Sequence, residues 1–317
     1  MSAAADKQTL ITVLDGGTGR ELRRMGAPFR QPEWSALALM EAPAFITRVH
    51  QAFIDAGADV ITTNSYALVP FHIGAERFER DGLALARLAG RLAREAADSA
   101  QRRVLVAGSL PPICGSYRAE WFDPLFARPI LRALVEGLRP YVDHWLAETL
   151  SSIEEAELVQ EVIGHDGKPL WLSFTLRDDA AAGSLEPQLR SGQSVVEAVA
   201  AAVRLGAHSL LFNCSQPEVM GAAVSVAAQL LRGSAQSASI GIGVYANAFM
   251  ARSMELKANA NADLNDIRSD LTPADYLVWV NDWIERGARI VGGCCGIGPE
   301  HIRAIRESIT RRAPQTG

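Results

Sequence analysis

The chain has 317 residues, of which 48% are hydrophobic and 21% are charged, and this composition is typical of a globular protein with a sizeable buried core. Its formal net charge of −5 gives no electrostatic basis for binding nucleic acid or an anionic membrane. The N-terminal residues do not resemble a signal peptide, and no apolar run approaches the roughly 20 residues that span a bilayer.

The first predicted strand is the short apolar run Thr12 to Asp15, which ends in a carboxylate and is followed by Gly16 to Gly19. These glycines do not complete the G-x-G-x-x-G pattern of a dinucleotide-binding loop, because its last position falls at Leu22. We therefore do not expect a nucleotide site here.

A repeated junction of helix, Gly-Ala and strand organises the rest of the chain. Apolar residues recur at helical spacing from 44 to 56, and Gly57 with Ala58 then leads into a strand that ends at Asn64. The same Gly-Ala junction precedes apolar runs at 209–213 and 290–293. Three such junctions predict a repeated αβ unit.

The remaining predicted strands lie at 104–107, 145–148, 170–174 and 240–245. Eight strands separated by helices, in a chain of this length, predict an α/β protein with a single (β/α)8 TIM barrel. We expect this barrel domain to span residues 11–310, between short tails at 1–10 and 311–317.

Local signals predict two helix starts and two long loops. Ser215-Gln216-Pro217-Glu218 has the pattern of a capping box, and Thr272-Pro273-Ala274-Asp275 has a cap with proline at the first helical position. The stretches 109–129 and 247–271 are predicted to be elaborated loops above the barrel.

The active site of such a barrel lies at the carboxyl ends of its strands. The residues predicted at those ends are Asp15, Asn64, Ser109, Glu148, Thr175, Cys214, Asn247, Cys294 and Cys295.

The thiols in this set suggest a metal site. Cys294 and Cys295 are flanked by glycines, which allow the backbone to leave the strand so that both sulfurs point to one place. Together with Cys214 they can hold a zinc ion with one coordination position open. The alternatives are a buried small side chain at Cys214 and a vicinal redox dithiol at the pair, whereas Cys114 is expected to have no role. Four cysteines without a disulfide pattern indicate a reducing, cytoplasmic environment.

The other candidates also have alternatives. Asp15 can simply cap the turn that follows it, and Glu148 can lie on the barrel exterior or pair with an arginine. The six histidines form neither H-x-H on a strand nor H-E-x-x-H, so a histidine-built metallohydrolase site is not predicted.

Four motifs resemble the homocysteine S-methyltransferase family. They are Leu14 to Gly17, Gly57 to Tyr66, Asn213-Cys214-Ser215 and Gly292 to Gly296, and the similarity runs in order from about residue 11 to residue 305. The resemblance implies a TIM barrel in which Cys214, Cys294 and Cys295 bind Zn²⁺. It also implies that Asp15 and Glu148 contact homocysteine.

The implied activity is a zinc-dependent transfer of a methyl group to the thiol of homocysteine, which gives methionine. The chain leaves no room for folate- or cobalamin-binding domains, so we expect a small diffusing donor. S-methylmethionine is favoured, with S-adenosylmethionine as a second sulfonium and a quaternary ammonium such as betaine as a further alternative. The alternatives are a redox enzyme that uses Cys294 and Cys295, and a homocysteine- or zinc-binding subunit that needs a partner carrying the donor. The sequence does not indicate an oligomeric state.

The donor-binding region departs from the family pattern. Many members that use S-methylmethionine carry a Tyr-Pro-Asn-Ser-Gly-like segment, where this chain has Tyr245-Ala246-Asn247-Ala248-Phe249. Aromatic faces can hold a sulfonium cation. The residues expected to overhang the site are Tyr66, Phe71, Trp121 and Phe122.

Overall fold

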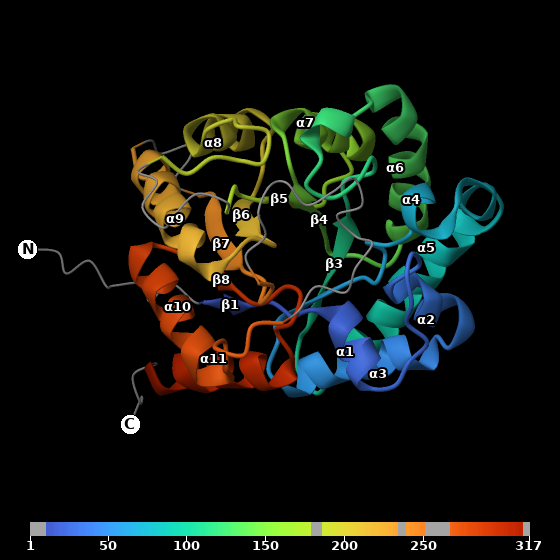
Figure 1. The fold of residues 1–317 in the computed structure, drawn as a ribbon, viewed down its shortest axis with the longest axis horizontal. Helices are drawn as coiled ribbons and strands as arrows, with labels where there is room; N and C mark the ends of the chain where they lie inside the picture. The colour runs from blue at the N-terminus through green and yellow to red at the C-terminus, as the bar shows by residue number, and fades with distance from the viewer. Residues whose placement is uncertain (1–10, 179–185, 234–238, 251–266, 313–317) are drawn as a thin grey trace, which may run out of the picture.

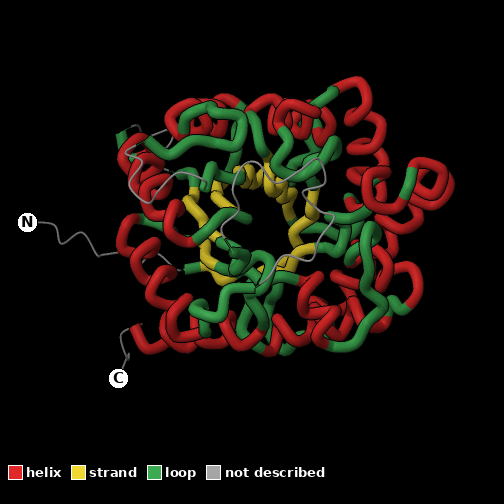
Figure 2. The backbone as a smooth tube through the Cα atoms, viewed as in Figure 1, coloured by secondary structure: helices red, strands yellow, loops and turns green. Residues whose placement is uncertain are grey.

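The computed structural model shows a ring of eight parallel strands surrounded by helices (Figure 1, Figure 2). The structure describes residues 11–178, 186–233, 239–250 and 267–312. The strands are β1 (Thr12–Val13), β2 (Val60–Thr62), β3 (Leu105–Leu110), β4 (His144–Leu150), β5 (Leu170–Phe174), β6 (Ser209–Asn213), β7 (Gly241–Tyr245) and β8 (Ile290–Val291). They pair in the order β1-β8-β7-β6-β5-β4-β3-β2. The ring closes where Leu14 bridges Val60 and the amide of Asp15 donates to the Val60 carbonyl at 3.0 Å. The predicted eight-stranded barrel is confirmed, and the proposed domain bounds of 11–310 stay a prediction.

The helices lie on the outside of the ring (Figure 2). They are α1 (Thr18–Arg24), α2 (Ser35–Glu41), α3 (Ala44–Asp55), α4 (Pro70–Ile73), α5 (Ala75–Asp98), α6 (Pro124–Leu138), α7 (Ile153–Ile163), α8 (Val195–Arg204), α9 (Pro217–Leu231), α10 (Pro273–Arg286) and α11 (Pro299–Arg312), with a 3-10 helix η1 (Ala119–Trp121). Within the described ranges, none of these helices is long and apolar enough to cross a membrane.

The Gly-Ala junctions end helices as predicted. Gly57, Gly206 and Gly287 have φ angles of 105°, 68° and 126°, a region that L-residues with a Cβ atom rarely adopt. Each glycine lets the chain turn directly from a helix into the next strand.

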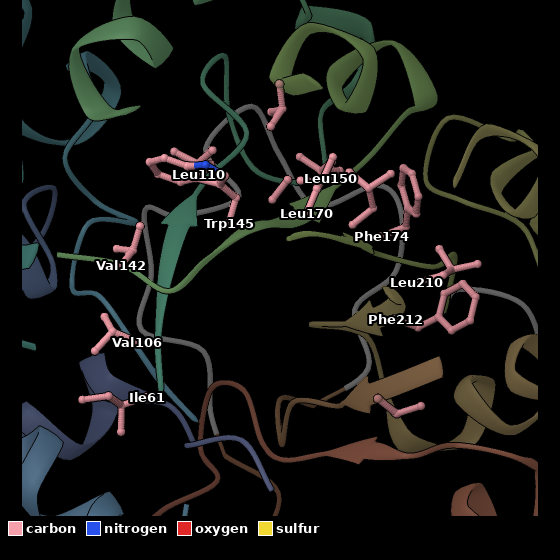
Figure 3. Packing of buried hydrophobic residues seen from close by; sticks show 14 of the residues in the cluster. Ile61, Val106, Leu110, Val142, Trp145, Leu150, Leu170, Phe174, Leu210 and Phe212 are labelled. Atoms are coloured by element: carbon pink, nitrogen blue, oxygen red, sulfur yellow. The ribbon is translucent and has the colours of Figure 1, made fainter. Parts of the chain in front are cut away.

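Successive side chains along each strand point to opposite faces of the sheet, and this produces two hydrophobic layers. On β6, Leu210 and Phe212 belong to the large layer between the strands and the helices, whereas Leu211 packs with Leu146 and Tyr245 in a smaller cluster. Figure 3 shows the larger side chains of the outer layer, such as Trp145, pointing away from the barrel axis. The inner cluster fills the barrel, so the site lies above a packed floor rather than a pore.

Helix α9 begins without the predicted capping box. Its N-cap is Gln216, and no side chain caps the helix there. The hydroxyl of Ser215 instead accepts from the Leu176 amide at 2.8 Å, because the end of the neighbouring strand offers a better-placed partner. At Thr272 the predicted cap is confirmed, since its hydroxyl accepts from the Asp275 amide at 3.4 Å.

The first predicted long loop is shorter than expected. Strand β3 extends to Leu110 and helix α6 begins at Pro124, so only the segment between them is irregular apart from η1. In the second predicted loop, residues 251–266 lie outside the described residues.

Candidate active site

Three cysteine sulfurs meet at the carboxyl ends of β6 and β8. The Sγ atom of Cys294 lies 3.1 Å from that of Cys214, and the ligand atoms of Cys214, Cys294 and Cys295 all lie within 4.8 Å of one another. Four tetrahedral ligands at the usual zinc–sulfur distance of about 2.3 Å are about 3.8 Å apart. The cluster therefore has the size and the donor chemistry of a metal site.

A sharp turn after β8 presents the vicinal pair. The amide of Cys294 donates to the Ala246 carbonyl after β7 at 2.9 Å, which holds the turn against the next strand end. A Cβ atom on Gly293 would lie 2.1 Å from Ile297 Cγ2, so only glycine fits there. Glycine is thus required at Gly293 by this close approach rather than by a positive φ, whereas Gly296 after the pair has a φ of 87°.

Hydrogen bonds among the three thiols shift their pKa values in opposite directions. The pKa of Cys214 is lowered because the thiols of Cys294 and Cys295 and the hydroxyl of Tyr117 hydrogen-bond to its sulfur. Donation to Cys214 raises the pKa of both Cys294 and Cys295. The hydrogen bonds thus converge on the Cys214 sulfur, and a metal ion would have to displace the thiol protons of the cluster.

Asp15 is buried in the cavity next to the cluster. Its carboxylate accepts from the Thr62 amide at 2.7 Å and from the Thr62 hydroxyl at 3.0 Å. Burial nevertheless raises the pKa of Asp15 to about 7. The side chain is bound by the neighbouring strand, so Asp15 does more than cap its own turn.

Glu148 reaches the same cavity from β4. Its Oε1 accepts from the Ser109 hydroxyl at 2.5 Å, and its Oε2 accepts from the Tyr245 hydroxyl at 3.2 Å. Burial raises the pKa of Glu148 to about 7, and the negative charge of Asp15 adds to this rise. The structure therefore places Glu148 inside the site and not on the barrel exterior.

The aromatic lining differs from the prediction. Of the four aromatic residues expected over the site, only Tyr66 is among the described residues that line the cavity. Phe71 and Trp121 are 40% and 37% exposed, and Phe122 packs against the core. The Phe71 ring instead packs edge-on against His72, and the Arg118 guanidinium lies over the Trp121 ring. The aromatic residues that line it besides Tyr66 are Trp34, Tyr117, Tyr245 and Phe249.

Backbone strain is concentrated around the cavity. In the described part of the chain, the non-glycine residues with positive φ are Trp34, Tyr117, Thr149 and Cys214, and all four line the cavity. Such residues persist only where the surrounding structure holds them, and they cluster at functional sites. No local sequence pattern pointed to Trp34 or Tyr117, whose conformations depend on distant contacts.

The other predicted strand-end residues support the site. Asn64 donates to the Ser35 carbonyl at 3.1 Å, Thr175 and Ser215 share a hydroxyl hydrogen bond of 2.9 Å, and Asn247 accepts from the Phe249 amide at 3.2 Å. Cys114 is not part of the metal cluster, and its sulfur accepts from the Asp123 amide at 3.4 Å.

Comparisons with known proteins agree with this geometry. A family model described as homocysteine S-methyltransferase matches residues 12–309. A homocysteine S-methyltransferase from Escherichia coli (strain K12) is 30% identical, with 96% of this chain and 97% of that protein covered. A selenocysteine methyltransferase from Astragalus bisulcatus is 27% identical, with 92% of this chain and 90% of that protein covered. The metallated crystal form of the homocysteine methyltransferase MmuM from Escherichia coli has a TM-score of 0.71 at 29% identity, covering 96% of this chain and 97% of that one.

Proposed function

This chain belongs to the homocysteine S-methyltransferase family, and we propose that it transfers a methyl group from a small sulfonium donor to the thiol of homocysteine, giving methionine. The observation that carries the proposal is that three cysteine sulfurs and two buried carboxyl groups line one cavity with an aromatic wall. The sulfurs suit the reacting thiol, the carboxyl groups suit the ammonium of an amino acid, and the aromatic faces suit a cation.

Zinc is the proposed metal ion, and Cys214, Cys294 and Cys295 would hold it. Three thiolates are soft ligands, and zinc with three protein ligands keeps a fourth position for substrate. When bound there, zinc would act as a Lewis acid that lowers the pKa of a substrate thiol.

Asp15 and Glu148 are the proposed partners of the homocysteine ammonium. Both pKa values are raised to about 7 by burial, so neither group is fully ionised at neutral pH before substrate arrives. A bound ammonium would stabilise the carboxylate forms and compensate for their burial. Thr62, Ser109 and Tyr245 fix the two carboxyl groups, and hence the direction in which the amino acid extends.

The donor is proposed to be a small sulfonium, with S-methylmethionine favoured and S-adenosylmethionine as the second candidate. Trp34, Tyr66 and Phe249 line the cavity and can hold the cation against their faces. Attack of a thiolate on the methyl carbon forms one carbon–sulfur bond and breaks another, and the donor leaves as a neutral thioether. Because charge is cancelled in this step, a site that excludes water favours it.

The competing interpretations have less support. A redox enzyme built on Cys294 and Cys295 would not require Cys214, yet Cys214 is the sulfur onto which the other two thiols converge. The family assignment also favours an enzyme over a passive binding subunit. The need for three reduced thiols is consistent with a cytoplasmic location.

The test is methionine formation by zinc-loaded protein supplied with homocysteine and one donor at a time. We expect turnover with S-methylmethionine, weaker or no turnover with S-adenosylmethionine, and none in the Cys294→Ser variant. Selenocysteine should be included as an acceptor, because one relative is a selenocysteine methyltransferase. Turnover only with methyltetrahydrofolate or methylcobalamin would contradict the proposal.

A further inference from the structure

We propose that Tyr117 is a positioning residue for the metal centre, whose hydroxyl donates a hydrogen bond to the Cys214 sulfur and thereby limits how much negative charge this sulfur gives to the metal. The phenolic oxygen lies 2.9 Å from Cys214 Sγ. The inference rests on the three-cysteine metal site of the proposed function, but it concerns a residue outside the ligand set.

The direction of this hydrogen bond follows from the chemistry of the two groups. A cysteine that binds a metal does so as a thiolate, which has no proton to donate. A phenol has an ordinary pKa of about 10 and keeps its proton at neutral pH. The hydroxyl of Tyr117 is therefore the donor, and the sulfur of Cys214 is the acceptor.

Both partners of the hydrogen bond are held in unfavourable backbone conformations. Tyr117 has a φ of 66° and Cys214 a φ of 53°. A non-glycine residue persists in this region only where its surroundings compensate for the backbone strain. The side chains of these two strained residues are in contact. This indicates that the surrounding structure holds both backbones in place and thereby maintains the contact.

A closed series of contacts fixes the tyrosine relative to the cysteine. The guanidinium of Arg190 lies over the Tyr117 ring, 5.0 Å from its centroid, and pairs with Asp178 at 2.7 Å. Asp178 also accepts from the amide of Gln216 at 3.3 Å. Because Gln216 follows Cys214 by two residues, the contacts return to the strand end from which the sulfur projects.

The charge above the ring affects the strength of the hydrogen bond. A cation on the aromatic face withdraws electron density from the ring, which makes the phenolic proton a better donor. A hydrogen bond to a thiolate stabilises its lone pairs and weakens its donation to the metal. The metal would then keep more positive charge and lower the pKa of a substrate thiol further, since groups that hydrogen-bond to ligands tune the metal in this way.

The experiment uses full-length protein loaded with cobalt(II), without homocysteine or donor, so that methyl transfer is not the readout. In Tyr117→Phe we expect the thiolate-to-cobalt charge-transfer bands to shift to lower energy, because the sulfur lone pairs are no longer stabilised. Replacement of Tyr117 with 3-fluorotyrosine strengthens the donor while keeping its shape, and should shift the bands to higher energy.

Tyr66→Phe is the matched control. Tyr66 lines the same cavity, but its hydroxyl pairs with the Ser116 hydroxyl at 2.6 Å. Its loss should leave the cobalt bands in place, whatever it does to donor binding. The inference is overturned if the bands do not move in Tyr117→Phe and in the 3-fluorotyrosine protein, or if they move equally in Tyr66→Phe. Absence of thiolate-to-cobalt bands in the unmodified protein would instead contradict the metal site itself.

Discussion

The side-chain amide of Asn213 holds Thr149 from two sides, across the intervening strand β5. Asn213 Oδ1 accepts from the Thr149 amide at 2.9 Å, and its Nδ2 donates to the Thr149 hydroxyl at 2.9 Å. Thr149 has a φ of 60° and lies at the irregularity in β4 between Ala147 and Leu150. Thr149 directly follows Glu148, and Asn213 directly precedes Cys214. One buried amide therefore positions both a proposed substrate contact and a proposed metal ligand.

We predict that Asn213→Ala destabilises the protein and weakens homocysteine binding. The substitution leaves the buried Thr149 amide without its acceptor, which costs about 2 kcal/mol. It also releases the turn that directs Glu148 into the cavity, so homocysteine affinity should fall by about tenfold or more. Urea unfolding and calorimetric titration measure the two effects.

A second substitution tests whether the turn is the cause. Glycine adopts positive φ without strain, so Thr149→Gly in the Asn213→Ala background should recover part of the homocysteine affinity. If affinity were unchanged in Asn213→Ala, or if glycine gave no recovery, the amide would not act through Thr149.

The fold could be predicted because its signals are local. Apolar runs predicted all eight strands, and three of these runs follow Gly-Ala junctions, which recur because Gly57, Gly206 and Gly287 adopt left-handed conformations. The cysteine cluster could be predicted equally well, since the strand-end positions of the cysteines and their flanking glycines can be read from the sequence.

Features that depend on distant partners could not be predicted in this way. Ser215 has the local pattern of a helix cap, but its hydroxyl bonds to Leu176 on another strand end. Tyr117 is placed in the site by a left-handed backbone and by Arg190, which is 73 residues further along the chain.

The raised pKa values predict a pH dependence of amino-acid binding. The pKa values of Asp15 and Glu148 are about 7, above their ordinary values, so both carboxyl groups become neutral as the pH falls through 7. An ammonium binds the carboxylate forms, so affinity should rise with pH by up to about tenfold per pH unit for each group that must lose its proton. Methionine is the suitable ligand for calorimetry between about pH 6 and pH 8, because it has no thiol proton to release.

Glu148→Gln should weaken methionine binding and reduce its pH dependence, because one of the two titrating groups is lost. Glu155→Gln is the matched control. Burial also raises the pKa of Glu155 to about 7, but this side chain caps α7 through the Ser151 and Ser152 amides. The assignment of the ammonium site would be wrong if both variants changed the pH dependence equally.

Metal binding is predicted to depend on the three clustered cysteines and not on Cys114. Cys294→Ser should lose most bound zinc, since one of the three proposed thiolate ligands is replaced by a hydroxyl. Because a metal that binds only the folded state stabilises it, a chelator should lower the Tm of the unmodified protein but not that of this variant. Cys114→Ser should keep both the zinc and the chelator effect. Stoichiometric zinc in Cys294→Ser would contradict the assigned ligand set.

The last prediction concerns the glycine that allows the vicinal cysteines to turn into the site. A Cβ atom at Gly293 would meet Ile297 Cγ2 at 2.1 Å and Ile297 Cβ at 2.4 Å, and real side chains do not approach so closely. Since Ile297 is fully buried, it cannot move aside, and the backbone that carries Cys294 must shift instead. Gly293→Ala should therefore lower zinc affinity and destabilise the protein by about 1 to 3 kcal/mol. Gly19→Ala is the control. Gly19 lies within helix α1, and a Cβ atom there would meet only the Phe29 ring, at an ordinary contact distance of 3.4 Å. Metal titration and urea unfolding of the two variants should separate them, and zinc affinity retained in Gly293→Ala would show that the turn does not depend on this glycine.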